Sequence, residues 1–301
     1  MGRYSIKDLE QLSGIKAHTI RIWEKRHQII VPSRTTTNIR FYSDEDLKKI
    51  INVSLLNNNG IKISRIADMS ATELNEKVLA ISEDQTDASI PIDQLVVAMV
   101  DMDEESFEKI LNNLILRFGF EGTFTEIVYP FLEKIGLLWQ TEQITPAQEH
   151  FVSNLIRQKV IVAIDGLPLP PRTSRKVLLF LPESELHELG LLFYHYLTRK
   201  TGYRSFYFGQ CLPHIDLVQS VAIHTPALMV TCITTTPLVP FPEYVSLLKS
   251  DFLNIPILLS GYQVRSNKEL ITGNLHPFSQ PDEFKFLISD DGVGLKPISF
   301  V

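Results

Sequence analysis

The sequence predicts a multidomain chain, mixed α and α/β, in which helices come first and a parallel sheet comes last. Residues 1–165 have the pattern of helical segments with few breaks. The segment Gly-Leu-Pro-Leu-Pro-Pro at 166–171 is a rigid linker signal, and after it short apolar runs alternate with helical patterns. That alternation is typical of parallel strands joined by crossover helices. We therefore expect domains at 1–72, 73–168 and 174–301.

The composition is that of an ordinary globular protein, with 44% hydrophobic and 21% charged residues. No apolar run reaches the roughly 18–20 residues that a membrane span needs, and no signal peptide is evident. The only cysteines, Cys211 and Cys232, have no paired spacing, so we expect neither a disulfide framework nor a zinc site. These features predict a cytoplasmic protein without a membrane partner.

Charge is unevenly distributed along the chain, whose net charge is −6. Residues 1–70 hold 12 Lys and Arg against 7 Asp and Glu, whereas the remaining 231 residues hold 17 against 28. A basic head on an acidic body suits nucleic-acid binding, because neutralised phosphates supply much of the affinity. A basic segment alone does not establish that function.

Two short helices are expected at the N-terminus. Ser5 can cap a helix over 6–12, which Ser13-Gly14 ends, and a second helix follows over 17–26. Because the second helix is basic and the turn between them contains glycine, the pair is a helix-turn-helix candidate.

The second helix has two different faces. Ile20 and Trp23 lie on one face at i and i+3, while Arg21 and Lys25 lie on another at i and i+4. We interpret Trp23 as a core residue rather than as a DNA contact.

A polar hairpin is expected next, over the segment PSRTTTNIRFY at 32–42. Its two arginines, Arg34 and Arg40, and its aromatic end suit a wing that reaches the DNA backbone. Ser43 then caps a longer helix with acidic residues in its first turn.

The residues after 174 predict a Rossmann-like (flavodoxin-like) parallel sheet, and the helical segments before the linker predict a four-helix bundle. The expected strands cover 176–181, 204–208, 228–233 and 255–260, and the expected helices cover 185–200, 215–223 and 244–249. No fifth strand–helix pair is evident after Gly261.

Trp139 ends an apolar helix over 131–138, and Glu149-His150 lie early in the next helix. A helical hairpin would bring these three side chains together over one pocket. The alternative is that Trp139 belongs to the core and that Glu149 and His150 are surface residues.

A histidine flanked by carboxylates follows the first strand of the sheet, in the order Glu185-Leu186-His187-Glu188. Ligands of such sheets bind beyond the carboxyl ends of the strands. A carboxylate that orients one ring nitrogen lets a histidine act as a metal ligand. A lone loop histidine is usually not a ligand, so the pattern alone leaves this open.

The head resembles the MerR regulators in the order and spacing of YSIKDLEQLSGIKAHTIRIWEKR, RFYSDEDLKKI and NNNGIKISRIADM. The resemblance implies a homo-oligomer, a dimer or a tetramer, that reads a double-stranded, pseudo-palindromic DNA operator. It implies DNA contacts from His18, Thr19, Arg21, Lys25 and Arg26 on the second helix and from Arg34, Arg40 and Tyr42 in the wing.

The body resembles the cobalamin-binding domains through Glu185-x-His187-x-x-Gly190. Thr231-x-Ile233 stands where that family has Ser-x-Leu, and Ser260-Gly261 stands where it has Gly-Gly. The resemblance implies that His187 is the lower ligand of the cobalt. Thr231 keeps a hydroxyl, whereas Ser260 adds a side chain close to the place of the nucleotide tail.

The Trp139-x9-Glu149-His150 pattern is similar to that of the CarH/LitR-type light-responsive regulators. In that subgroup these three residues cap the adenosyl group of adenosylcobalamin, which is therefore the expected cofactor. Gln140 departs from the photoreceptor members, which carry a histidine there as the upper cobalt ligand after illumination. Light switching with a second histidine is therefore not expected.

Three functions remain open on the sequence. The first is a transcription regulator, repressor or activator, that is gated by adenosylcobalamin or light. The second is a regulator whose cobalamin-like domain has lost the cofactor and serves oligomerisation or partner binding. The third is an enzyme component, a corrinoid methyl carrier. A methyl carrier has no need to read DNA, and no catalytic acid–base constellation is evident, so we expect a regulator that is not an enzyme.

Overall fold

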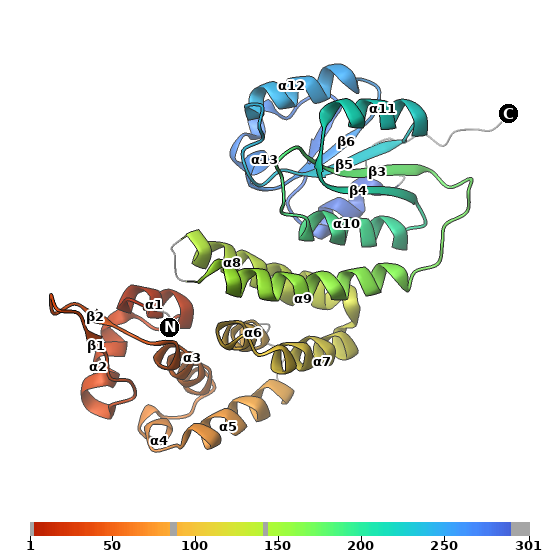
Figure 1. Ribbon diagram of the computed structural model, residues 1–301. Coiled ribbons are helices and arrows are strands. Elements are labelled where there is room, and N and C mark those ends of the chain that lie inside the picture. The colour runs from red at the N-terminus through yellow and green to blue at the C-terminus, as the bar shows by residue number, and fades with distance from the viewer. Residues whose placement is uncertain (1–2, 85–88, 141–143, 290–301) are drawn as a thin grey trace. The chain divides into compact units, whose positions relative to one another are not determined.

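The computed structural model describes residues 3–84, 89–140 and 144–289 (Figure 1). The chain forms two compact units, residues 1–155 and 156–301, which are described in turn. Within the described residues, no helix is both long and apolar enough to cross a membrane.

The head forms the expected helix-turn-helix with a hairpin wing. Its elements are α1 (Ile6–Ser13), α2 (Ala17–His27), β1 (Ser33–Arg34), β2 (Arg40–Phe41), α3 (Asp44–Asn58) and α4 (Ile63–Ala67). Ser5 and Ser43 cap α1 and α3 through reciprocal hydrogen bonds with Asp8 and Asp46, as expected of capping boxes. Trp23 is buried, which confirms it as a core residue.

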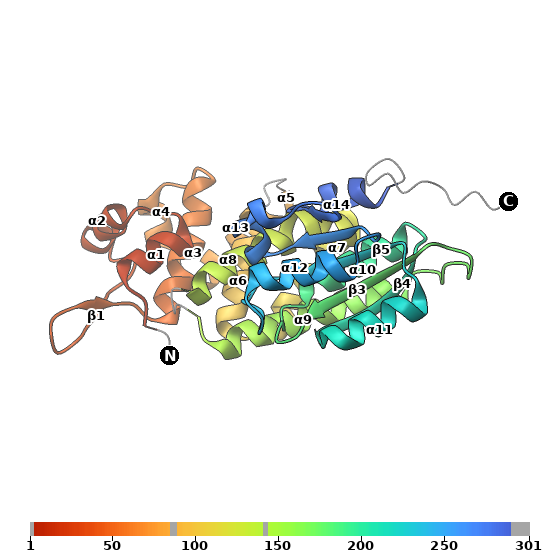
Figure 2. The ribbon, with the colours of Figure 1, turned by 90° about the horizontal axis from the view of Figure 1, so that it is seen from above.

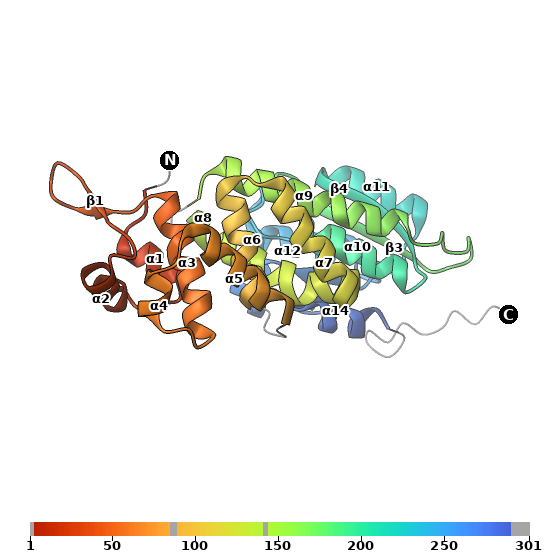
Figure 3. The ribbon, with the colours of Figure 1, turned by 90° about the horizontal axis from the view of Figure 1, so that it is seen from below.

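The helical bundle follows the head. Its elements are α5 (Ala71–Asp84), α6 (Ser89–Asp101), α7 (Glu104–Thr123), a π-helical turn (Phe124–Val128), α8 (Tyr129–Gln140) and α9 (Pro146–Asp165). Gly119 has a φ of 72° and marks a kink within α7. Helix α3 contacts α5 and α6, so the head and the bundle helices pack against each other (Figure 3).

The second unit contains a five-stranded parallel sheet in the order β4-β3-β5-β6-β7. Its strands are β3 (Lys176–Pro182), β4 (Arg204–Leu212), β5 (Leu228–Cys232), β6 (Ile257–Ser260) and β7 (Leu275–Pro277). Its helices are α10 (Leu189–Lys200), α11 (His214–His224), α12 (Phe241–Asp251), α13 (Tyr262–Ser266), a 3₁₀ turn (Lys268–Leu270) and α14 (Pro281–Ile288). This strand order is the flavodoxin-like one, whose switch point lies between β3 and β5.

Helices cover both faces of the sheet. Helices α11, α12 and α13 lie on one face, and α10 and α14 lie on the other (Figure 1). Side chains of successive β3 residues point to opposite faces of the sheet. Leu178 and Phe180 belong to the hydrophobic core between the sheet and helices α11 and α12. Because both faces are buried, the inner strands β3, β5 and β6 appear in the sequence as short apolar runs.

Two expectations about the second unit are corrected. A fifth strand–helix pair does exist, formed by β7 and α14, and it was missed because β7 has only three residues, one of them proline. The first crossover helix begins at Leu189 rather than at Glu185. Residues 183–188 form a loop instead, because the Glu185 carboxylate bonds to backbone amides of another loop.

Candidate functional site

Helix α2 presents a basic surface on the head. Its exposed or half-buried side chains include those expected to contact DNA, namely His18, Thr19, Arg21, Lys25 and Arg26. Ile20 and Trp23 lie on the opposite face and are buried in the core of the head. The helix is therefore fixed by its apolar side and offers cations on its outer side, as a helix in the major groove requires.

The β1–β2 hairpin carries two exposed arginines, Arg34 and Arg40. Arg34 Nη1 donates to Asn38 Oδ1 at 2.6 Å, and Asn38 takes the left-handed conformation with a φ of 65°. The hairpin projects from the rest of the head (Figure 2). Its arginines are thus accessible to phosphate groups.

Tyr42 was expected to contact DNA, and this expectation is corrected because its side chain is fully buried. Its hydroxyl donates to the Glu24 carboxylate of α2, and its backbone pairs with that of Tyr4. Burial, together with the Glu24 carboxylate, raises the pKa of Tyr42. Tyr42 therefore holds the base of the wing against α2.

Glu149 and His150 lie in the first turns of α9. His150 Nδ1 is 2.7 Å from Glu149 Oε2, and Ser153 Oγ donates to Glu149 Oε1 at 2.6 Å. His150 is exposed, so its imidazole is accessible to a ligand. Trp139 and Gln140 are the last residues of α8, but their side chains lie outside the described part of the structure.

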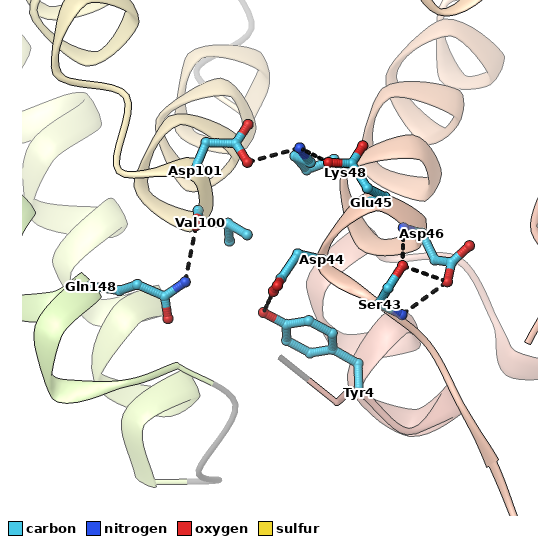
Figure 4. A network of polar contacts seen from close by, with 9 residues as sticks. All are labelled: Tyr4, Ser43, Asp44, Glu45, Asp46, Lys48, Val100, Asp101 and Gln148. Carbon is cyan, nitrogen blue, oxygen red and sulfur yellow. Dashed lines mark hydrogen bonds and ion pairs between the residues drawn. The ribbon is translucent and has the colours of Figure 1, made fainter. Parts of the chain in front are cut away.

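Polar contacts connect the start of α9 to the head (Figure 4). Gln148 Nε2 donates to the carbonyl of Val100 at 3.1 Å, and the next residue, Asp101, accepts from Lys48 Nζ of α3 at 2.8 Å. Gln148 directly precedes Glu149. The end of α6 therefore lies between the expected cap residues and the DNA-binding head.

Helix α8 makes a second connection to the head. Lys134 Nζ donates to the carbonyl of Leu12, at the end of α1, at 3.1 Å, and pairs with Asp93 of α6 at 2.7 Å. Both helices that carry the expected cap residues thus contact the head, either directly or through α6.

The loop after β3 carries a histidine–carboxylate pair. His187 Nδ1 is 2.7 Å from Glu185 Oε1, which also accepts the backbone N–H of His187 at 2.9 Å. The Glu185 side chain is buried, whereas the imidazole is 59% exposed. Since the carboxylate engages Nδ1, it selects the tautomer in which Nε2 carries the lone pair.

Glu185 also connects the loop after β3 to the loop after β5. Its Oε2 accepts from the backbone amides of Thr234 and Thr235 at 2.7 and 2.8 Å and from Thr235 Oγ1 at 3.1 Å. Burial alone would raise the pKa of Glu185, but the hydrogen bonds from His187 and these threonines outweigh burial and lower the pKa to about 2. The carboxylate is therefore ionised at neutral pH and strengthens the imidazole as an electron donor.

The remaining residues expected at the site lie at the ends of β5 and β6 and at the start of α10. Thr231 is fully buried, and its Oγ1 has no hydrogen-bond partner among the described residues. Gly261 has a φ of 107°, and a Cβ there would lie 2.3 Å from the carbonyl oxygen of the buried Ile233. Ser260 is buried beside it, and Gly190 lies in the first turn of α10.

Comparison with known proteins identifies two parts of the chain. Residues 4–73 match the model of the MerR HTH family regulatory proteins, and residues 91–163 match that of the B12 binding domain. The chain carries a MerR-type head and a B12-binding domain. The first match covers α1 to α4, and the second extends from α6 into α9.

Curated relatives extend this assignment. The chain is 29% identical over 229 residues to the HTH-type transcriptional repressor CarH of Myxococcus xanthus, covering 74% of this chain and 76% of the relative. It is 25% identical over 210 residues to the repressor CarA of the same organism, covering 69% and 68%. The expected resemblance is confirmed, and together with the MerR-type head it supports a DNA-binding transcription regulator.

A solved structure supports the fold of the B12-binding part. The monomethylamine corrinoid protein of Methanosarcina barkeri is similar with a TM-score of 0.53 and 15% sequence identity, over 66% of this chain and 97% of that chain. At this identity the likeness concerns the fold alone.

The chemistry of the residues present fits a B12 group. Within the described ranges, no group of three or more His, Cys, Asp or Glu side chains could hold a metal. The single imidazole of His187, with the Glu185 carboxylate on its Nδ1, suits a metal that brings its other ligands with it, as cobalt does in a corrin ring. The buried hydroxyl of Thr231, unpaired within the described part of the chain, is the kind of group that a ligand satisfies on binding.

Three residues that hold predicted site residues in place were not identified from the sequence. Thr234 and Thr235 hold Glu185, and the only signal for them was a threonine run just after the Thr231-x-Ile233 pattern. Glu24 was missed because a glutamate within a basic helix looks like a solvent-exposed residue.

Proposed function

We propose that operator binding by this MerR-type regulator is controlled by cobalamin, with His187 as the lower cobalt ligand. The observation that carries the proposal is the Glu185–His187 pair, 2.7 Å apart, on the loop after β3. That loop borders the switch point of the sheet, where ligands of such folds bind. A neutral imidazole with a carboxylate behind it is a strong ligand of cobalt.

On the DNA side, we expect different effects from the two exposed arginines Arg21 and Arg40. Arg21→Ala should weaken binding to the cognate operator by roughly 1–3 kcal/mol, because an arginine of the recognition helix meets a base edge. Arg40→Ala should lower affinity evenly across sequences and flatten its salt dependence, because a wing arginine meets phosphate. Titrations of operator and unrelated DNA at several salt concentrations measure both. Equal losses on both DNAs for Arg21→Ala would contradict its role in base reading.

We further propose that the bound form is adenosylcobalamin, capped by Trp139 together with Glu149 and His150. This finer assignment is supported by the similarity to the CarH repressor and by the exposed His150 imidazole at the start of α9. Trp139→Ala should erase a preference for adenosylcobalamin over methylcobalamin and leave part of the cobalamin affinity intact. Competition titrations with the two cobalamins measure the preference. If the unsubstituted protein binds both forms equally, Trp139 has no capping role.

Control by the cofactor requires a difference in affinity between two states of the protein. We propose that cobalamin favours a homo-oligomer that reads a pseudo-palindromic operator. Adenosylcobalamin supplies a cobalt–carbon bond that light breaks, so light would act by removing the group that Trp139 covers. Gln140 offers an amide where photoreceptor members have an imidazole, so we expect no second protein histidine on the cobalt.

Absorption spectra of the purified chain, titrated with adenosylcobalamin and hydroxocobalamin, test the cofactor proposal. We expect saturable binding of the adenosyl form with the spectrum of histidine-ligated cobalt. The alternative function is a regulator whose B12-binding domain has lost its cofactor, and the buried side chain of Ser260 favours it. Binding of neither form at tens of micromolar concentration would establish that alternative.

A further inference from the structure

A second carboxylate of the His187 loop, that of Glu188, is held by side chains from two other elements. Glu188 Oε1 accepts from Arg157 Nε of α9 at 2.5 Å, and Glu188 Oε2 accepts from the Tyr207 hydroxyl of β4 at 3.0 Å. The Glu188 side chain is 11% exposed, while that of Arg157 is 48% exposed. The buried carboxylate thus has one cationic partner and one neutral partner within the described residues.

The Tyr207 ring is held in place by contacts of its own. The Tyr207 ring stacks on the His195 ring of α10 with centroids 4.9 Å apart, and His195 Nε2 is 2.8 Å from Ser205 Oγ. Burial and the Glu188 carboxylate raise the pKa of Tyr207, so its hydroxyl keeps its proton and donates it. Tyr207 therefore offers Glu188 a fixed hydrogen bond but cannot compensate its charge, and the cation of Arg157 has to do so.

The backbone of the loop is held by hydrogen bonds on both sides of His187. The Glu185 carboxylate fixes the beginning of the loop to Thr234 and Thr235. Gln210 Nε2 donates to the carbonyl of Leu186 at 2.6 Å. Glu188 fixes the end of the loop, because its own carbonyl accepts the first helical hydrogen bond of α10. Because Glu188 directly follows His187 in the chain, a displacement of Glu188 would also displace the backbone of His187.

Arg157 connects this loop to the helix of the expected cap residues. It lies on α9 eight residues after Glu149, which is two helical turns or about 12 Å along the helix. If the N-terminal residues of α9 moved and the helix moved with them, Arg157 would move as well. Its guanidinium would then displace the Glu188 carboxylate to which it is bonded.

We propose that Arg157 is a positioning residue for His187: by compensating the buried charge of Glu188, it fixes the loop that presents the imidazole and couples that loop to α9. The part of this proposal that concerns cobalt ligation rests on the proposed function. The part that concerns the loop is a property of the cofactor-free protein.

Hydrogen exchange of the peptide 183–188 in the cofactor-free full-length chain tests the loop. Arg157→Met should speed exchange by roughly tenfold, because it leaves the Glu188 carboxylate buried without its cation. Arg157→Lys should restore most of the protection, because it keeps the charge. The double variant Arg157→Met with Glu188→Gln should exchange more slowly than Arg157→Met alone, because the unpaired charge is gone. Gln158→Met, at the exposed neighbouring position of α9, is the matched control and should exchange like the unsubstituted chain.

Titration of the same variants with adenosylcobalamin tests the ligation. Arg157→Met should bind roughly tenfold more weakly and show a smaller fraction of histidine-ligated cobalt at saturation, with Arg157→Lys again near the unsubstituted protein. Unchanged exchange in Arg157→Met, or no rescue by Glu188→Gln, would overturn the proposal. If the unsubstituted chain binds no cobalamin, the proposed function fails, and the exchange result still decides whether Arg157 fixes the loop.

Discussion

His187→Ala should lower cobalamin affinity by about a hundredfold or more and abolish the spectrum of histidine-ligated cobalt. Loss of a residue that merely orients a metal ligand typically costs 10–100-fold in affinity, and loss of the ligand itself costs at least as much. The Glu185 carboxylate would also lose the side-chain hydrogen bond that it makes at 2.7 Å. Absorption titrations of the dark-handled protein measure both effects.

His214→Ala is the matched control for this variant. His214 Nε2 lies 2.7 Å from Asp251 Oδ2, so it forms a second histidine–carboxylate pair in the same unit, between the start of α11 and the end of α12. This variant should keep the cobalamin spectrum and affinity. If His187→Ala bound cobalamin like the control, with an unchanged spectrum, His187 would not be the cobalt ligand.

Gly261→Ala should destabilise the chain by about 3 kcal/mol, through a steric clash and through backbone strain. The new Cβ would lie 2.3 Å from the Ile233 carbonyl oxygen, which already accepts the backbone N–H of Gln263 at 3.0 Å. The φ of 107° at Gly261 is one that residues with side chains rarely adopt. Urea denaturation measures the change in the free energy of unfolding, and cobalamin titration tests whether the site is lost with it.

Gly273→Ala separates the clash from the strain. Gly273 has a φ of 74°, but a Cβ there would meet no described atom within 4 Å. We expect this variant to lose only about 1 kcal/mol, from the left-handed backbone alone. Equal losses in the two variants would contradict the close approach of Gly261 to Ile233.

The architecture was largely predictable because local chemistry agrees with the fold. Ser5 and Ser43 are helix caps with their aspartates three residues later, and both caps form. Strands β3, β5 and β6 are apolar runs because helices cover both faces of the sheet. β7 is too short to give such a signal, and only its pairing with β6 makes it a strand.

Only those contacts of the site that are made within one short sequence motif could be predicted from the sequence. Glu185 and His187 are two residues apart, so their pairing is local, whereas Thr234 and Thr235 reach Glu185 from about 50 residues away. Tyr42 was assigned to the wrong role for the same reason. Its partner Glu24 lies 18 residues earlier, and nothing near Tyr42 indicates that its ring is buried.

Cobalamin is proposed to control the affinity of the head for operator DNA. The most direct measurement is the operator affinity of one dark-handled preparation, without cofactor and with saturating adenosylcobalamin, with the absorption spectrum recorded on each sample. We expect binding to be about tenfold tighter with the cofactor, which lies within the usual range of coupling between two sites. An unchanged operator affinity in samples whose spectra prove that the cofactor is bound would contradict the claim.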